Sequence, residues 1–109
     1  MNVNFEFNEP GAAEKIYFET IEAEKRGGGL VKNPTDADMA PSTPLKYDTD
    51  GKTFVKASAS DTPVAVLGSW VYKDQGDQMA KIVFKGTLRK ENAVITATQA
   101  NKIAGIILV

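Results

Sequence analysis

The chain has 109 residues, of which 42% are hydrophobic and 25% charged, the size and composition of one globular domain. It contains neither cysteine nor histidine, which excludes disulfides, thiolate nucleophiles, zinc–sulfur sites and a histidine general base. The formal net charge of −1 gives no overall field that would select a polyanion, although residues 1–40 are acidic and residues 41–109 are mildly basic.

Residues 2–8 alternate polar and apolar side chains, which predicts a strand with Val3, Phe5 and Phe7 on one face. Pro10-Gly11 interrupts the pattern. A single strand does not bury its aromatic side chains by itself, so this one needs a sheet. Two interpretations remain open: an internal edge strand, or a strand that adds to the sheet of a partner.

Residues 12–40 give weaker signals. Residues 12–26 fit either a short charged helix or a strand. Glycines 27–29 end this element and predict a flexible hinge, and the proline-rich residues 33–44 predict a loop or linker. We therefore expect an N-terminal arm and linker over residues 1–40 and a compact β-rich domain over residues 41–109.

Two local signals open the compact domain. Residues 45–47 and 53–55 flank Asp48-Thr49-Asp50-Gly51, which predicts a hairpin with glycine at a position of positive φ. Residues 63–68 predict a short buried strand. Together with the patterns in residues 78–109, these signals predict a mainly β fold with one or two short helices, of the α+β class.

The last third of the chain predicts two strands and a helix. Residues 78–85 alternate, with one face toward the core and the other toward solvent. The predicted core face holds Ala80, Ile82 and Phe84, and the other face holds Lys81, Val83 and Lys85. Thr96 or Thr98 is expected to cap a short helix over residues 99–103. Residues 106–109 predict an apolar strand, which must be paired because an exposed edge would aggregate.

Two polar groups resemble parts of active or metal sites. Asp48 and Asp50 resemble the start of a calcium loop, but the twelfth position is Ala59 rather than a bidentate glutamate, which favours a simple turn. Ser58 and Asp61 suggest a hydrolase, but a chain without histidine has no Ser-His-Asp triad. We therefore expect no enzyme, no metal and no cofactor.

Two basic segments suggest phosphate or nucleic-acid binding, and both also have a purely structural explanation. The segment Lys25–Gly29 lacks the Gly-Lys-Ser/Thr ending of a phosphate-binding loop. Trp70 and Tyr72 suggest stacking on nucleic acid together with a set of basic residues in the same part of the chain. That set is Lys81, Lys85, Arg89 and Lys90. A small β-barrel that binds nucleic acid is therefore the alternative hypothesis, although a solvated sheet face explains the same charges.

From Ala40 onward the sequence resembles the head decoration proteins of lambda-type phages. The likeness covers about two-thirds of the chain, and it is carried by the order and spacing of six segments rather than by one motif. These segments are Ala40–Leu45, Tyr47–Thr49, Lys52–Val55, Pro63–Leu67, Lys85–Arg89 and Ala104–Val109. The N-terminal 39 residues match poorly. A tryptophan that follows the first hairpin in the family is replaced here by Lys56-Ala57-Ser58.

The resemblance implies a structural protein of the virion. It implies a homotrimer on the three-fold sites of an expanded icosahedral head, on its outer surface, after assembly in the host cytoplasm. It also implies an N-terminal arm that adds β-structure to the major capsid protein, and we assign to that arm Val3, Phe5, Phe7, Ile16 and Phe18. Nucleic acid and membrane are not expected partners, since no apolar run approaches the ~18 residues of a membrane span and no secretory signal is visible.

Overall fold

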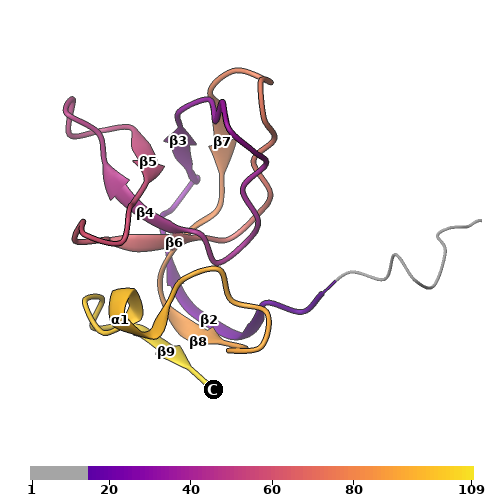
Figure 1. Ribbon diagram of the computed structural model, residues 1–109, viewed down its shortest axis with the longest axis vertical. Helices are drawn as coiled ribbons and strands as arrows, with labels where there is room; N and C mark the ends of the chain where they lie inside the picture. The colour runs from indigo at the N-terminus through magenta and orange to yellow at the C-terminus, as the bar shows by residue number, and fades with distance from the viewer. Residues whose placement is uncertain (1–14) are drawn as a thin grey trace, which may run out of the picture.

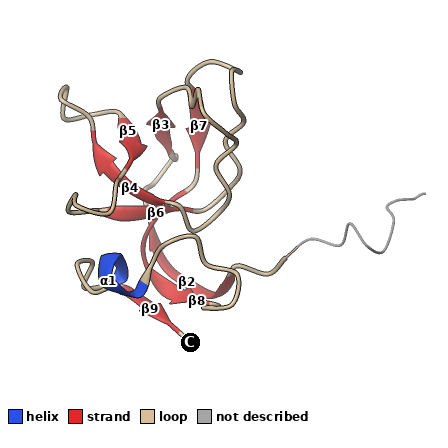
Figure 2. Ribbon diagram, viewed as in Figure 1, coloured by secondary structure: helices blue, strands red, loops and turns tan. Residues whose placement is uncertain are grey.

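The computed structural model of the chain describes residues 15–109, which form a mainly β structure with one short helix (Figures 1 and 2). This confirms the predicted fold class. The elements are β2 (Phe18–Glu24), β3 (Gly29–Val31), β4 (Pro44–Tyr47), β5 (Phe54–Lys56), β6 (Ala65–Leu67), β7 (Gln78–Ala80), β8 (Ile82–Leu88), α1 (Ala97–Ala100) and β9 (Ile106–Leu108). None of the helices in residues 15–109 has the length and apolar character needed to cross a membrane.

The strands form one curled sheet with the order β2-β8-β6-β4-β5-β3-β7, and β9 lies beside β8. The β3–β5 and β8–β9 pairs are parallel, and the other pairs are antiparallel. Figure 1 shows β3, β5 and β7 at one end of the molecule and β2, β8, β9 and α1 at the other. The two ends therefore present different surfaces to any partner.

Strand β8 organises the end of the molecule that holds the first and the last of the described strands. One edge of β8 pairs with β2, and its other edge pairs first with β6 and then with β9. At the end of β8, Leu88 lies between Phe18, the first residue of β2, and Leu108, the last residue of β9. The first residue of β2 and the last residue of β9 therefore lie on the two sides of one strand end.

The predicted hairpin forms between β4 and β5, with Tyr47 opposite Phe54. Gly51 has φ +71°, the left-handed conformation that glycine adopts at little cost. The Asp48 N–H donates to the Thr53 carbonyl at 2.7 Å and closes the turn. The hairpin prediction is confirmed in both its strands and its glycine.

The curl of the sheet creates two apolar clusters. The first lies among β3 to β8 and contains Val31, Met39, Leu45, Phe54, Ala65, Leu67, Val71, Ala80 and Ile82. The second packs against α1 and β9 and contains Val66, Val83, Leu88, Ile95, Ala100, Ile103 and Ile106. Strands β6 and β8 separate the clusters, since Leu67 and Ile82 belong to the first and their chain neighbours Val66 and Val83 to the second.

This arrangement corrects the alternation predicted over residues 78–85. Ile82 is buried and Lys81 and Lys85 are exposed, as predicted, but the strand is broken at Lys81 into β7 and β8. Val83, predicted on the lysine face, is fully buried in the second cluster. Phe84 is only half-buried and packs against the first cluster. The prediction was wrong for Val83 because β8 is covered on both faces there.

Helix α1 begins at the predicted cap. The Thr96 side chain accepts a hydrogen bond from the Gln99 N–H at 3.1 Å, and the Gln99 side chain accepts one from the Thr96 N–H at 3.0 Å. This reciprocal capping box satisfies two helix N-terminal donors. The helix spans Ala97–Ala100, which is earlier than the predicted residues 99–103.

The sheet starts well before Pro41, where the compact domain was expected to begin. Residues 18–24, which fitted either a helix or a strand, form β2 and pair with β8. Residues 29–31 form β3 and pair with β5 and β7. Strands on both sides of residue 41 therefore belong to one sheet, so that boundary does not separate an arm from a body within the described residues.

Candidate functional site

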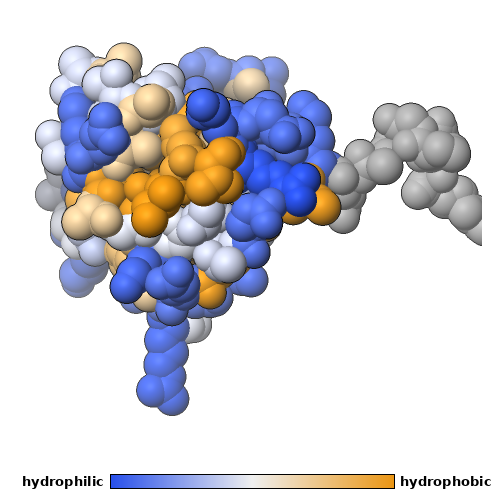
Figure 3. Space-filling model, turned by 90° about the horizontal axis from the view of Figure 1, so that it is seen from below, coloured by the Kyte–Doolittle hydropathy of each residue, from blue (hydrophilic) through white to orange (hydrophobic). Residues whose placement is uncertain are grey.

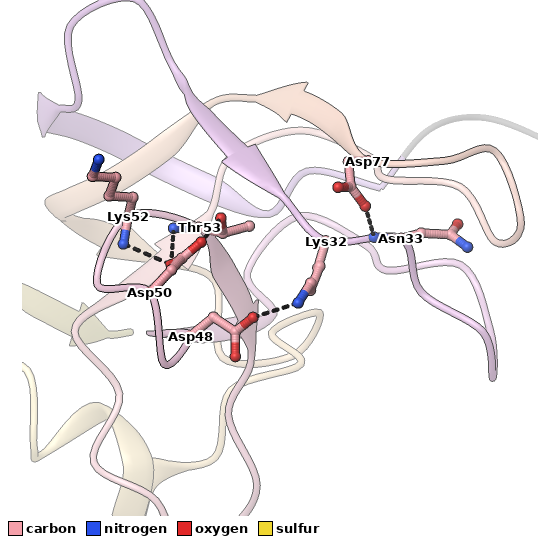
Figure 4. A network of polar contacts seen from close by, with 7 residues as sticks. All are labelled: Lys32, Asn33, Asp48, Asp50, Lys52, Thr53 and Asp77. Atoms are coloured by element: carbon pink, nitrogen blue, oxygen red, sulfur yellow. Dashed lines mark hydrogen bonds and ion pairs between the residues drawn. The ribbon is translucent and has the colours of Figure 1, made fainter.

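The two aspartates that resemble a calcium loop lie in the β4–β5 turn, where both already bind other groups of the protein (Figure 4). Asp50 accepts hydrogen bonds from the N–H groups of Lys52 and Thr53, both at 2.8 Å, and from the Thr53 hydroxyl. The Thr53 hydroxyl and these N–H groups lower the pKa of Asp50 to about 2. Asp48 binds the Lys32 ammonium at 2.7 Å, and this contact lowers the pKa of Asp48. Within residues 15–109, no three acidic side chains are grouped so that they would hold a metal ion.

Ser58 and Asp61 likewise form a local loop structure. Asp61 accepts hydrogen bonds from the Ser58 N–H at 2.7 Å and from the Ser58 hydroxyl at 2.9 Å, and it pairs with Lys46 at 3.1 Å. The Ser58 N–H and then the Lys46 ammonium lower the pKa of Asp61 to about 2, which makes its carboxylate a poor base for the serine. The loop is held against α1, where the Gln99 side-chain amide donates to the Ser58 carbonyl at 3.3 Å, and against the residues after the helix, where the Lys102 ammonium donates to the Asp61 carbonyl at 3.0 Å.

The glycine triplet forms a tight turn between β2 and β3. The Gly28 N–H donates to the Lys25 carbonyl at 2.9 Å, and Gly27 and Gly28 both have φ near +80°. A Cβ on Gly29 would lie 2.7 Å from the Phe54 ring. The expected flexible hinge is therefore wrong: the glycines are needed for the turn and for close packing within the sheet.

The basic residues proposed for nucleic-acid binding divide between two places. Lys85 lies 3.5 Å from Glu22, and Arg89 is paired with Glu19, so β2 places a glutamate beside each of them. Trp70 and Tyr72 lie on the segment that precedes β7, with their rings stacked. Lys81 lies next to the start of this segment, since its N–H donates to the Ser69 hydroxyl at 3.0 Å. The fold thus leaves Lys81 near the aromatic pair and places Lys85 and Arg89 beside β2, where their acidic partners reduce their attraction for phosphate.

Two of the five predicted arm residues are described, and they have different environments. Ile16 is 53% exposed, while Phe18 begins β2, is half-buried and packs against the second cluster. Val3, Phe5 and Phe7 lie outside the described residues. Phe18 is thus part of the sheet, and of the two described residues only Ile16 presents a largely exposed apolar side chain.

Ile16 and Tyr17, which we call the arm root, are fastened by hydrogen bonds to residues just after β8. The Ile16 carbonyl accepts a hydrogen bond from the Asn92 side chain at 2.7 Å, and the Tyr17 carbonyl accepts one from the Arg89 N–H at 2.9 Å. On the other side of β8, the Val109 N–H donates to the Leu88 carbonyl at 2.9 Å. The arm root and Val109 are therefore both bonded at the same end of β8.

Beside this root, β9 presents an apolar face that sequence patterning did not single out. Ile107 and Val109 are 58% and 63% exposed, while Ile106 is buried in the second cluster. Figure 3 shows hydrophobic side chains gathered on the lower face of the molecule, where β9 lies in Figure 1. The signal was present in residues 106–109: all four are apolar, but a strand that packs one face on its own core leaves the other face exposed.

No protein-family model matches the chain, and no curated protein matches it as a relative.

Proposed function

We propose that this chain is a capsid decoration protein that docks as a homotrimer onto the expanded head of a phage and stabilises the shell. The observation that carries the proposal is the convergence of the arm root and the exposed face of Ile107 and Val109 at one end of β8. In this proposal, residues 2–8 add a strand to the sheet of the major capsid protein, and the β9 face rests on the shell beside it.

The short length of the segment between residues 2–8 and β2 supports a single binding surface, on which the arm and the β9 face bind side by side. We call this surface the footprint. The segment 9–15 spans at most about 23 Å when extended, and β2 and β9 are separated by two strand spacings of about 4.8 Å. If residues 2–8 are docked, the β9 face must therefore lie within a few tens of ångströms of the same surface. Three copies acting together then bind far more tightly than one arm alone.

The family resemblance is consistent with the elements that build this end. Two of its six segments, Lys85–Arg89 and Ala104–Val109, contain most of the β8–β9 contact. Their glycines fit tightly, since a Cβ on Gly86 or on Gly105 would lie 2.6 Å from a backbone oxygen of the neighbouring chain segment. The resembling segments thus coincide with positions where the fold restricts the residue type.

The test is occupancy of purified, expanded heads that lack decoration. We expect the full chain to saturate such heads and to raise their resistance to heat. Deleting residues 1–14, or replacing Phe5 and Phe7 by aspartate, should abolish occupancy while circular dichroism and the melting temperature of the free protein stay unchanged. Sedimentation of the free protein at micromolar concentration should give three times the chain mass.

A matched pair of variants distinguishes specific binding through the β9 face from non-specific hydrophobic binding. Ile107→Ser with Val109→Ser should reduce occupancy, whereas Leu30→Ser with Met79→Ser should not. Leu30 and Met79 are also exposed, at 40% and 63%, but they lie on β3 and β7 at the opposite end of the molecule (Figure 1). Full occupancy by the Phe5 and Phe7 double variant would contradict the docking role of the arm.

A further inference from the structure

Trp70 and Tyr72 form an exposed pair of aromatic rings on the segment before β7. Their ring centroids are 6.2 Å apart and their planes differ by 8°. The two residues are 42% and 49% exposed. Tryptophan and tyrosine supply much of the binding energy at protein interfaces, because each brings a large and rigid surface with few rotatable bonds.

The backbone that carries the rings is fixed at each step. Val71, between them, is fully buried and exchanges two hydrogen bonds with Met39, at 2.8 and 3.0 Å. The Tyr72 N–H donates to the Gln78 side chain at 3.0 Å, and the Tyr72 carbonyl accepts from it at 2.8 Å. The Lys73 N–H donates to the Asp38 carboxylate at 2.7 Å. The pair is therefore held in place before any ligand arrives, which reduces the entropy lost on binding.

The rings lie on a lobe made of the two loops 33–39 and 70–78. The Asp74 N–H donates to the Pro34 carbonyl at 3.0 Å, and the Gly76 N–H donates to the Asn33 side chain at 3.1 Å. The Asn33 N–H in turn donates to the Asp77 carboxylate at 2.9 Å (Figure 4). We call this unit the acidic lobe.

Charge on the acidic lobe is mostly of one sign. Its carboxylates are those of Asp36, Asp38, Asp74 and Asp77, against one cation within the two loops, Lys73. Three more lysines lie at its edge: Lys32 and Lys56, which face the loop 33–39, and Lys81, next to Ser69, and of these Lys32 is paired with Asp48. A negative potential beside exposed aromatic faces attracts a cation and repels a phosphate backbone. Arginine suits such a surface best, because its planar guanidinium stacks on aromatic rings while it donates hydrogen bonds to carboxylates.

We propose that the acidic lobe binds an arginine-bearing peptide segment of a partner protein, with a guanidinium on the Trp70–Tyr72 rings. This site does not depend on the proposed docking of the arm. The lobe adjoins β3 and β7, at the opposite end of the molecule from β9, so both surfaces are open to partners at the same time (Figure 1).

The chain supplies its own reporter, because Trp70 is its single tryptophan. The probe is a capped Gly-Arg-Gly-Arg-Gly peptide titrated into the full-length protein while tryptophan fluorescence is recorded. We expect a saturable change in fluorescence, and we expect the affinity to fall as the salt concentration is raised. The control peptide carries citrulline in place of arginine, which keeps the planar shape and removes the charge, and we expect it to bind at least several-fold more weakly.

Two kinds of variant test the residues. Tyr72→Ala keeps the reporter and should weaken arginine-peptide binding about two- to fivefold, the effect of one exposed cation–π contact. The double variant Asp36→Asn with Asp74→Asn should also weaken arginine-peptide binding. It should fold normally, because neither carboxylate makes a hydrogen bond within the described residues and asparagine tolerates the φ of +56° at position 74. Glu91→Gln removes an exposed charge outside the lobe and should leave binding unchanged.

Four results would overturn the proposal. They are equal binding of the arginine and citrulline peptides, stronger binding of a single-stranded oligonucleotide than of the arginine peptide, full binding by both lobe variants, and no fluorescence change at saturating probe. A fluorescence change that follows protein concentration without any peptide, and that disappears in Tyr72→Ala, would instead assign the surface to a second copy of the chain.

Discussion

Replacing Val83 by alanine tests whether β8 is buried on both faces. Strict alternation places Val83 with the exposed Lys81 and Lys85, and a change at such a surface site costs under about 0.5 kcal/mol. In the structure Val83 is fully buried in the second cluster, directly opposite Val66 of β6. Loss of two methyl groups costs about 1.6 kcal/mol of transfer free energy, and the remaining cavity raises the expected loss of unfolding free energy to about 2–3 kcal/mol.

Urea unfolding of Val83→Ala, followed by circular dichroism, measures this loss, with Lys81→Ala as the surface control on the same stretch of chain. The corresponding fall in melting temperature is about 10–20 °C for a domain of this size. If the two variants unfold at the same urea concentration with equal slopes, the second cluster does not cover Val83 and the two-sided burial of β8 is refuted.

Three further changes test particular contacts. Gly105→Ala places a Cβ 2.6 Å from the Phe84 carbonyl and should lower the unfolding free energy by about 1–3 kcal/mol in the same urea assay; unchanged stability would contradict this close approach. Thr96→Ala removes the helix cap and should cost about 1 kcal/mol, while Thr96→Ser should recover most of it. The Thr53 hydroxyl and backbone lower the folded-state pKa of Asp50 to about 2, so the stability it contributes is complete above pH 4 and lost as the pH falls toward 2. Asp50→Asn should therefore lose less stability than the native chain between pH 5 and pH 2, and equal losses would argue against the turn contacts.

The parts of the fold that depend on local chemistry were predictable from sequence. The β4–β5 hairpin depends on four adjacent residues and a glycine, and the cap of α1 depends on Thr96 and Gln99 three residues apart. Strand β2 was not assigned because its partner lies far along the chain: Glu19 and Arg89 are 70 residues apart. Periodicity says which residues share a face, but it does not say how many faces a strand buries, which is why Val83 was misassigned.

In the candidate site too, features that depend on local sequence were predictable and features that depend on distant contacts were not. Alternation in residues 2–8 indicates a strand, but no local pattern names its partner. Phe18 was grouped with the arm because it is aromatic and N-terminal, yet it packs under β8 and β9 through contacts that depend on the last residues of the chain. Ile107 and Val109 were treated as a strand to be paired, and pairing with β8 satisfies their backbone while leaving both side chains exposed.

Two ion pairs balance part of the charge asymmetry between the two parts of the chain. Glu19 and Glu22 of the acidic N-terminal part lie on β2 beside Arg89 and Lys85 of the basic C-terminal part. Exposed pairs of this kind contribute little stability, but they leave little net positive potential along this face of β8. On the acidic lobe at the other end, Lys32, Lys56 and Lys73 lie near the carboxylates, but none of the four aspartates forms an ion pair within the described residues. Charge thus distinguishes the two ends of the molecule. An apolar surface lies beside paired charges at the arm root, whereas aromatic rings lie beside carboxylates without ion-pair partners on the lobe, and the two proposals therefore assign a different kind of partner to each end.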